Sequence, residues 1–309
     1  MNLVNFFSVS IISVVFLGSC NDGNNNDVAD NIRKEAFKNR AEDFKDEDVK
    51  TYTKDQLKEL KTASKVVYTL PSPNEMATIL HETKAVYDIK ILNPVDNLDQ
   101  YVADLSKALN LGVYFADLSF TSMFDYPQQA MMFMGAAQAL TEELNIDGVF
   151  TEDMMIRLEE NTGDKDSLMQ IVADAYVETD MVLQEDERPV IAKGILTGAW
   201  IEGLYIAVNL QTDKGKEKEV REKIADQKPS LNNLIEMLKD IEEPQLMQLI
   251  KQLQQLQLAF EAVEVVEVKD DSEAGNLANM KKVVMTDSTF ELIKKIAIQT
   301  RDKVVTSKL

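Results

Sequence analysis

The chain has 309 residues, with 33 Lys and Arg against 53 Asp and Glu, and its formal net charge is −20. Binding to nucleic acid or to anionic lipid headgroups requires a cationic surface, so such an acidic chain argues against both kinds of partner. The chain has one cysteine, Cys20, and one histidine, His81. These counts exclude a disulfide framework, a Cys/His zinc site and a Cys–His catalytic dyad.

Helix-breaking residues are scarce, with only 11 Gly and 7 Pro, while helix-forming residues are abundant. This composition favours α-helices. We therefore predict a mainly α protein, a multi-helix bundle that could be helical-repeat-like, with an optional small β-hairpin near 264–286. The predicted organisation is a signal peptide over residues 1–19, a lipidated cysteine and polar tether over 20–50, and a single helical domain over 51–309.

The N-terminal segment has an apolar stretch from Val9 to Leu17 followed by small residues. This pattern is typical of a secretory signal rather than of a transmembrane anchor. The ending Leu17-Gly18-Ser19-Cys20 resembles the lipobox of bacterial lipoproteins, although no Lys or Arg precedes the apolar stretch. The resemblance implies cleavage between Ser19 and Cys20 and acylation of the Cys20 sulfur and its new amino group. Several acyl chains give stable anchoring, so we expect a bacterial cell-envelope location, at the outer membrane.

A tether without apolar side chains, NDGNNND, follows Cys20, and we expect it to be disordered. Residues 28–50 are charge-dense and form either a weakly packed helix or more tether. Residues 54–67 carry apolar side chains at helical spacing. Ser72, Pro73 and Glu75 then make a capping box that predicts a helix to about Thr83.

The remaining chain alternates helical patterns with breaks. A long apolar helix is expected from a cap at Asp96 or Asn97 to about Phe124. The later expected elements, in chain order, are helices at 127–144, 152–161 and 165–186, an apolar run at 190–210, a solvated segment at 213–228, helices at 229–241 and 244–263, the hairpin, and a helix starting at Ser288. Leucines spaced by three and four in 244–263 form a short seam that packs either inside the domain or in a coiled-coil dimer.

The apolar run VIAKGILTGAWIEGLYIAVNL is long enough to span a membrane, but it contains Lys193 and Glu202. We therefore predict that it is the buried centre of a bundle. Helical geometry places Gly198, Glu202 and Tyr205 on one stripe and Lys193 on roughly the opposite one. Either the Glu202 stripe faces a pocket, or Glu202 has a partner and the helix is only core.

The two most apolar helices show a faint likeness at an offset of 86 residues. The shared pattern, K-x4-G-x-aromatic-apolar-x2-L, matches Lys107 with Lys193 and Gly112 with Gly198. It indicates either a duplicated helical unit or a chance similarity between two apolar helices.

Glycine-rich phosphate loops, a GxSxG elbow, CxxC and an EF-hand loop are absent. We therefore predict no cofactor and no metal. The chemistry left is a set of carboxylates in apolar helices, above all Asp117 and Glu202. The candidate buried polar or pocket residues are Asp117, Lys193, Glu202 and Tyr205, with Asp174, Glu178 and Asp180 on the preceding helix. Each carboxylate either has a raised pKa and a function, or is satisfied by Lys193, Lys107, Arg188, Tyr205 or a helix end.

The lipobox, the Asn/Asp-rich tether and the segments ALNLGVYFADLSF and TGAWIEGLYIAVNL together resemble uncharacterised helical lipoproteins of Bacteroidota, over most of residues 70–215. This resemblance implies no assigned activity and no catalytic residues. We expect an envelope lipoprotein with a binding or structural role, whose partner is an envelope protein or a small ligand. The alternatives are a helical-repeat scaffold that binds proteins, and an enzyme that uses Asp117 or Glu202 as acid or base.

Overall fold

The computed structural model describes residues 71–309, except 162–163, 213–215 and 269–279. All described residues belong to one compact unit of the chain, Leu57–Leu309. The predicted signal peptide, the lipobox with Ser19 and Cys20, the tether and the expected helix at 54–67 lie outside the described residues.

The first described helix, α3 (Pro73–Glu82), begins at the predicted capping box. The backbone N–H of Glu75 donates to Ser72 Oγ at 3.3 Å, and the backbone N–H of Ser72 donates to Glu75 Oε2 at 2.6 Å. Two of the N–H groups that a helix start leaves without partners are thereby satisfied.

The long apolar helix, α4 (Asp104–Met123), begins later than predicted from Asp96 or Asn97. The preceding residues instead form β1 (Ala85–Val86) and two short 3-10 helices, η1 (Ile89–Ile91) and η2 (Val95–Gln100). The backbone leaves the helical conformation at Tyr101, whose side chain is buried and whose hydroxyl accepts a hydrogen bond from Asn93 Nδ2 at 3.0 Å. Burial of this ring separates η2 from α4.

The next helices lie close to their predicted bounds. They are α5 (Pro127–Glu143), α6 (Glu152–Glu160), α7 (Lys165–Glu185) and α8 (Pro189–Asn209). The Thr151 hydroxyl accepts from the Met154 N–H at the start of α6, and the Asp164 carboxylate accepts from two N–H groups at the start of α7. Both side chains satisfy backbone N–H groups that the start of a helix leaves without partners.

The C-terminal third contains one helix that the sequence analysis missed. The segment 213–228, predicted to be solvated, includes α9 (Glu217–Ala225), which buries Val220 and Ile224 one turn apart. The remaining elements are α10 (Lys228–Leu238), α11 (Pro244–Glu261), β3 (Glu264–Val268), β4 (Met280–Val284) and α12 (Asp287–Val305). The leucine seam of α11 is buried inside this unit. β3 pairs antiparallel with β4, and β1 pairs antiparallel with β2 (Gln211–Thr212).

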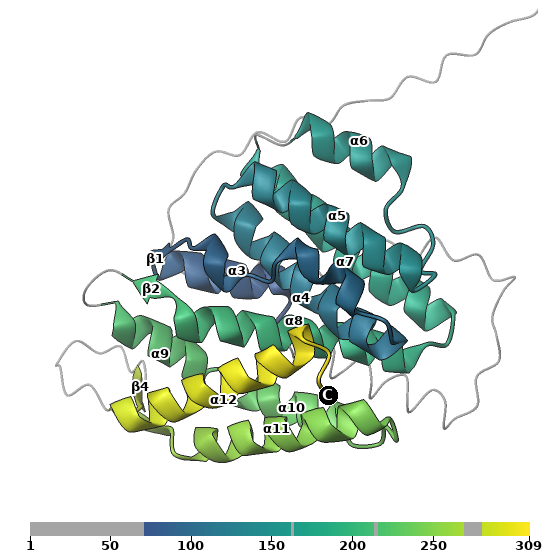
Figure 1. Cartoon of the computed structure of the whole chain (residues 1–309). Coiled ribbons are helices and arrows are strands. Elements are labelled where there is room, and N and C mark those ends of the chain that lie inside the picture. The colour runs from purple at the N-terminus through teal and green to yellow at the C-terminus, as the bar shows by residue number, and fades with distance from the viewer. Residues whose placement is uncertain (1–70, 162–163, 213–215, 269–279) are drawn as a thin grey trace, which may run out of the picture. The chain divides into compact units, whose positions relative to one another are not determined.

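Helices α4 and α8 form the centre of this mainly α fold (Figure 1). α4 packs against α3, α5 and α7, and α8 packs against α7, α9 and α12. α8 is also the one described helix that is long and apolar enough to cross a membrane, but 78% of its most apolar window is buried inside the protein. The prediction that this run is a buried core helix is confirmed.

The α4–α8 crossing is close because it is lined by glycine. A methyl group on Gly112 would lie 1.9 Å from the Ile195 carbonyl oxygen, and one on Gly198 would lie 1.8 Å from the Leu109 carbonyl oxygen. Further along, Asp117 interacts with Glu202, so the two helices run in the same direction. The absence of a Cβ lets the two backbones come into direct contact.

This contact is reciprocal under the 86-residue offset. The offset matches Gly112 with Gly198 and Leu109 with Ile195. Gly112 contacts the carbonyl of Ile195, and Gly198 contacts the carbonyl of Leu109, so the two contacts are equivalent under the offset. Such an exchange of equivalent contacts is characteristic of a two-fold relation. The flanking helices differ more, since α3 has 10 residues and α7 has 21. The reciprocal glycine contact therefore concerns α4 and α8 alone.

Candidate functional site

The main candidate site is a charged cluster between α4, α8 and α12. Arg301 of α12 donates two hydrogen bonds to Glu202 of α8, from Nε to Oε2 at 2.9 Å and from Nη2 to Oε1 at 3.1 Å. Glu202 is 0% exposed and Arg301 is 7% exposed. This two-point geometry matches the guanidinium fork to the carboxylate, and it is the kind of contact that a buried ion pair requires.

Tyr205 completes the environment of Arg301. It lies three residues after Glu202 on α8, and its ring centroid is 4.5 Å from the Arg301 guanidinium carbon. A cation over an aromatic face is attracted by the ring quadrupole. Burial lowers the pKa of Arg301, but the adjacent Glu202 carboxylate more than offsets this, and the pKa ends above its ordinary value. The guanidinium therefore keeps its charge.

Asp117 of α4 brings a second carboxyl group to this cluster. It is 0% exposed, and its Oδ2 accepts a hydrogen bond from the Asn93 backbone N–H at 3.0 Å. Its Oδ1 receives no hydrogen bond within the described part of the chain. Burial raises the pKa of Asp117 well above its ordinary value, and Glu202 raises it further, while Arg301 and the Asn93 amide act in the opposite direction. The protonated form of Asp117 is therefore favoured more than in a solvent-exposed carboxyl group.

The loop before α4 holds Asp117 from the other side. The Tyr114 hydroxyl donates to the Pro94 carbonyl at 3.0 Å, and Asn97 Nδ2 donates to Asn93 Oδ1 at 2.8 Å. With the bond between Asn93 and Tyr101, these contacts fix the loop against α4. Asn93 can therefore present its backbone N–H to the carboxyl group in one orientation.

Helix α12 also contacts α4 beyond the charged cluster. Asn110 Nδ2 donates to the Val304 carbonyl at 3.2 Å, and the hydroxyl oxygens of Ser106 and Ser307 lie 2.6 Å apart. The side chains of Ser106 and Asn110 on α4 thus face α12 and the end of the chain.

The four predicted site residues separate into two groups. Asp117, Glu202 and Tyr205 come together, as described. Lys193 lies nine residues before Glu202 on α8, roughly 13 Å along the helix axis, and it is partly exposed. Lys193 is therefore separate from the other three and too far along the helix to be the partner of Glu202.

The residue that sequence reasoning missed is Arg301. It was not among the expected partners of Glu202, although its spacing could have identified it. Arg301 lies four residues after Ala297 and three before Val304, on the buried stripe of α12. An arginine at an inward position of an amphipathic helix indicates a buried anionic partner.

The carboxylates predicted on α7 are arranged differently. Asp174 pairs with Arg157 of α6 at 3.1 Å, with both side chains well exposed. Asp180 accepts from Gln184 Nε2, and burial raises its pKa while this hydrogen bond lowers it. Neither residue belongs to the charged cluster.

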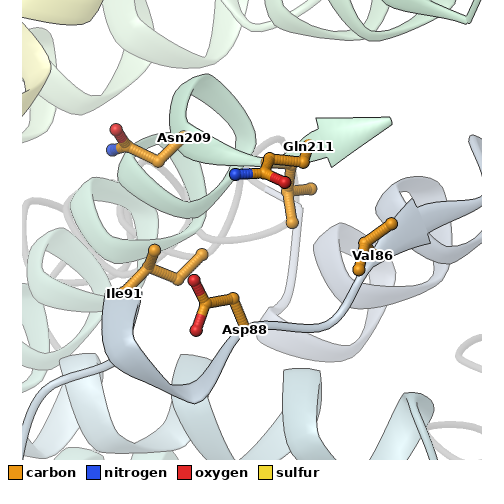
Figure 2. A pocket seen from close by; sticks show the side chains of 6 residues that line it. Val86, Asp88, Ile91, Asn209 and Gln211 are labelled. Atoms are coloured by element: carbon orange, nitrogen blue, oxygen red, sulfur yellow. The ribbon is translucent and has the colours of Figure 1, made fainter. Parts of the chain in front are cut away.

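Two hollows on the described surface lie away from the charged cluster, and neither is lined by Asp117, Glu202 or Arg301. The smaller, of about 10 Å³, lies between α3, α4 and α8 and is apolar. The larger, of about 110 Å³, lies where β1 meets the end of α8. Figure 2 shows Asp88 and Gln211 on opposite sides of it. Pockets for small molecules are typically about 300–1,000 Å³, so this hollow has room for only a few atoms.

A comparison with protein-family models, curated proteins and solved structures finds no match to this chain. The similarity to helical lipoproteins of Bacteroidota therefore stays a prediction. Among the described residues, no three His, Cys, Asp or Glu side chains are grouped so that they could hold a metal ion.

The geometry meets one of the two conditions for an acid–base site. The carboxyl groups of Asp117 and Glu202 do converge, as such a site requires. However, both are fully buried, and neither hollow opens onto them. Burial of both carboxyl groups, together with the ion pair to Arg301, suits a structural role in docking α12.

Proposed function

We propose that this chain is a lipid-anchored protein of the bacterial cell envelope, whose helical unit serves in binding or assembly rather than in catalysis. The observation that carries the anchoring is the lipobox Leu17-Gly18-Ser19-Cys20 behind an apolar stretch, in a chain with no other cysteine. The enclosed charged cluster supports the non-catalytic role, because its carboxyl groups are 0% exposed.

The anchoring is tested by Cys20→Ala in cells, with Ser19→Ala as the matched control that keeps a small residue before Cys20. We expect the original chain and Ser19→Ala to carry acyl chains by mass spectrometry and to sediment with membranes. Cys20→Ala should lose both properties and keep its helical circular dichroism, because Cys20 lies outside the helical unit. A Cys20→Ala variant that still carries acyl chains and sediments with membranes contradicts the proposal.

The binding role is tested by affinity capture from the protein's own detergent-solubilised envelope. A partner that both the original chain and Cys20→Ala retain is bound by the helical unit, because the lipid is absent from the variant. A partner lost with the lipid is only a neighbour in the membrane. If no protein or small molecule is retained by the variant, the binding role is refuted and a structural role remains.

A helical-repeat scaffold is the second candidate. The reciprocal contact of Gly112 and Gly198 favours it, because duplicated helices would be expected to share their packing positions. Repeat units contact mainly their neighbours and can unfold separately, so residues 73–145 and 151–228 should exchange amide hydrogens at distinct rates. Uniform exchange across both segments would identify one cooperative bundle instead.

A further inference from the structure

The charged cluster joins three elements that are far apart in the sequence. Asp117 lies on α4, Glu202 on α8 and Arg301 on α12, and α12 packs against both other helices. At this point α12 is held by the two hydrogen bonds from Arg301 to Glu202 and by the contact of its guanidinium with Tyr205. The seating of α12 therefore depends on the charge balance at one buried place.

The cluster carries a net negative charge if the carboxyl groups of both Asp117 and Glu202 are ionised. One guanidinium would face two negative charges, and Asp117 Oδ1 receives no hydrogen bond from the described residues. A proton on this oxygen removes the excess charge and supplies a donor toward Glu202. The opposite carboxyl oxygen, Oδ2, already accepts from the Asn93 N–H and so is not the place for the proton.

We propose that Asp117, Glu202 and Arg301 form a proton-dependent latch, in which a proton held between the two carboxyl groups keeps α12 seated on α4 and α8, and loss of that proton at raised pH loosens α12. The latch is a property of the helical unit and does not depend on the lipid anchor.

The other ionisable groups near the cluster do not supply a second cation. They are the hydroxyls of Tyr87, Tyr101, Tyr114 and Tyr205 and the carboxylate of Asp302. Burial raises the pKa of each of these four tyrosines, so they stay neutral through the neutral range. Asp117 is therefore the group in this cluster whose charge is expected to change as the pH is raised above its ordinary pKa.

The sign of the pH dependence follows from the direction of the Asp117 pKa shift. The carboxyl group ionises near its ordinary value of 3.8 when the chain is unfolded, and at a higher pH when it is folded. Between these two values the folded chain holds one more proton than the unfolded chain. Raising the pH then favours unfolding, by up to tenfold in the unfolding equilibrium constant for each pH unit. At pH values below the ordinary pKa of Asp117 or above its raised pKa, its ionisation no longer makes the unfolding equilibrium depend on pH.

Asp117→Asn tests the latch in the purified full chain. The amide has nearly the shape of a protonated carboxyl group, so its oxygen can accept from Asn93 and its nitrogen can donate to Glu202. The variant carries no titrating proton. We expect the ratio of the unfolding constants, original chain over variant, to rise with pH above about pH 4, by up to tenfold per unit, in denaturant titrations. A ratio that stays constant from pH 5 to pH 9 would overturn the proposal.

Loosening of α12 is read from tryptic cleavage after Arg301, a bond protected while this side chain is buried. The ratio of cleavage rates, original chain over Asp117→Asn, should be at least several times higher at pH 9 than at pH 6. Comparison at one pH cancels the pH dependence of the protease. Asp180→Asn, which removes another carboxyl group with a raised pKa, is the matched control and should be cut like the original chain. A ratio of cleavage rates that is the same at pH 6 and pH 9 would refute the latch.

A second measurement keeps the proposal testable if Asp117→Asn does not fold. The original chain at pH 7 should show the infrared carbonyl band of a protonated carboxylic acid while folded, and the band should vanish on unfolding. Absence of this band in the folded protein would show that Asp117 is ionised, and the latch would then be excluded.

Discussion

Helix α8 makes two kinds of contact with its neighbours. Against α4 it uses Gly198, and a methyl group added there would lie 1.8 Å from the Leu109 carbonyl oxygen. Against α12 it uses Glu202, which binds Arg301 at 2.9 and 3.1 Å. The first contact is between two backbones with no side chain between them, and the second is between two buried charges.

The two contacts should respond to different perturbations. The glycine crossing is set by shape, because close-packed backbones have no room to adjust. The ionic contact is set by charge and protonation, because a buried ion is stable only while its partner and hydrogen bonds are present. The contact of α8 with α4 should therefore be insensitive to pH, whereas its contact with α12 should depend on pH.

The largest effect is expected from removal of one buried charge. Arg301→Met leaves Glu202 buried without its cation and should lower the free energy of unfolding by about 3–5 kcal/mol, measured by denaturant titration. The double variant Glu202→Met and Arg301→Met should recover most of this loss, because both charges are gone.

Arg157→Met is the matched control for that substitution. The pair of Arg157 and Asp174 is exposed by 49% and 39%, so its loss should cost only about 0–1 kcal/mol. Equal losses for Arg301→Met and Arg157→Met would mean that the buried pair does not hold α12.

The next largest effect should come from Gly198→Ala, which pushes a methyl group into the α4 backbone. Overpacking of this kind typically costs about 1–3 kcal/mol, and we expect a value near 3 kcal/mol because a carbonyl oxygen cannot move aside. Gly135→Ala on α5 is the control, since its methyl group would meet nothing within 4 Å, and it should stabilise the chain by about 0.5–1 kcal/mol. Thermal unfolding that shifts equally for both variants would contradict the close crossing.

A smaller effect is expected at the neutral contact between α4 and α12. Asn110→Ala removes the donor to the Val304 carbonyl and should cost about 1–2 kcal/mol, seen as faster amide exchange at the end of α12. Gln257→Ala, which removes an exposed amide bonded to Asn232 at 2.7 Å, should change the stability by less than about 0.5 kcal/mol. If both substitutions leave the exchange of α12 unchanged, Asn110 does not contribute to its docking.

Most helix starts could be predicted because their causes are local. Ser72 with Glu75, Thr151 and Asp164 cap their helices by hydrogen bonds that span only two or three residues. The start of α4 could not be predicted in this way. It depends on Tyr101, which turns inward to contact a residue eight positions earlier, and no helix propensity records that contact.

The candidate site was predicted in part for the same reason. Glu202 and Tyr205 share a helix stripe, so their common direction follows from helical periodicity alone. The meeting of Glu202 with Asp117 and Arg301 joins three helices, and periodicity says only that each residue faces inward. Lys193 shares a helix with Glu202 and still lies too far away, because distance along the axis separates residues as effectively as a different face does.

The sequence by itself determined the helical class, the caps, the apolar character of α8 and the case for a lipid anchor at Cys20, because composition and short-range patterns cause these features. The tertiary structure alone decided which inward-facing groups meet and that the pKa of Asp117 is raised. Burial and neighbouring charge set a protonation state, and both come into existence only when α4, α8 and α12 pack together.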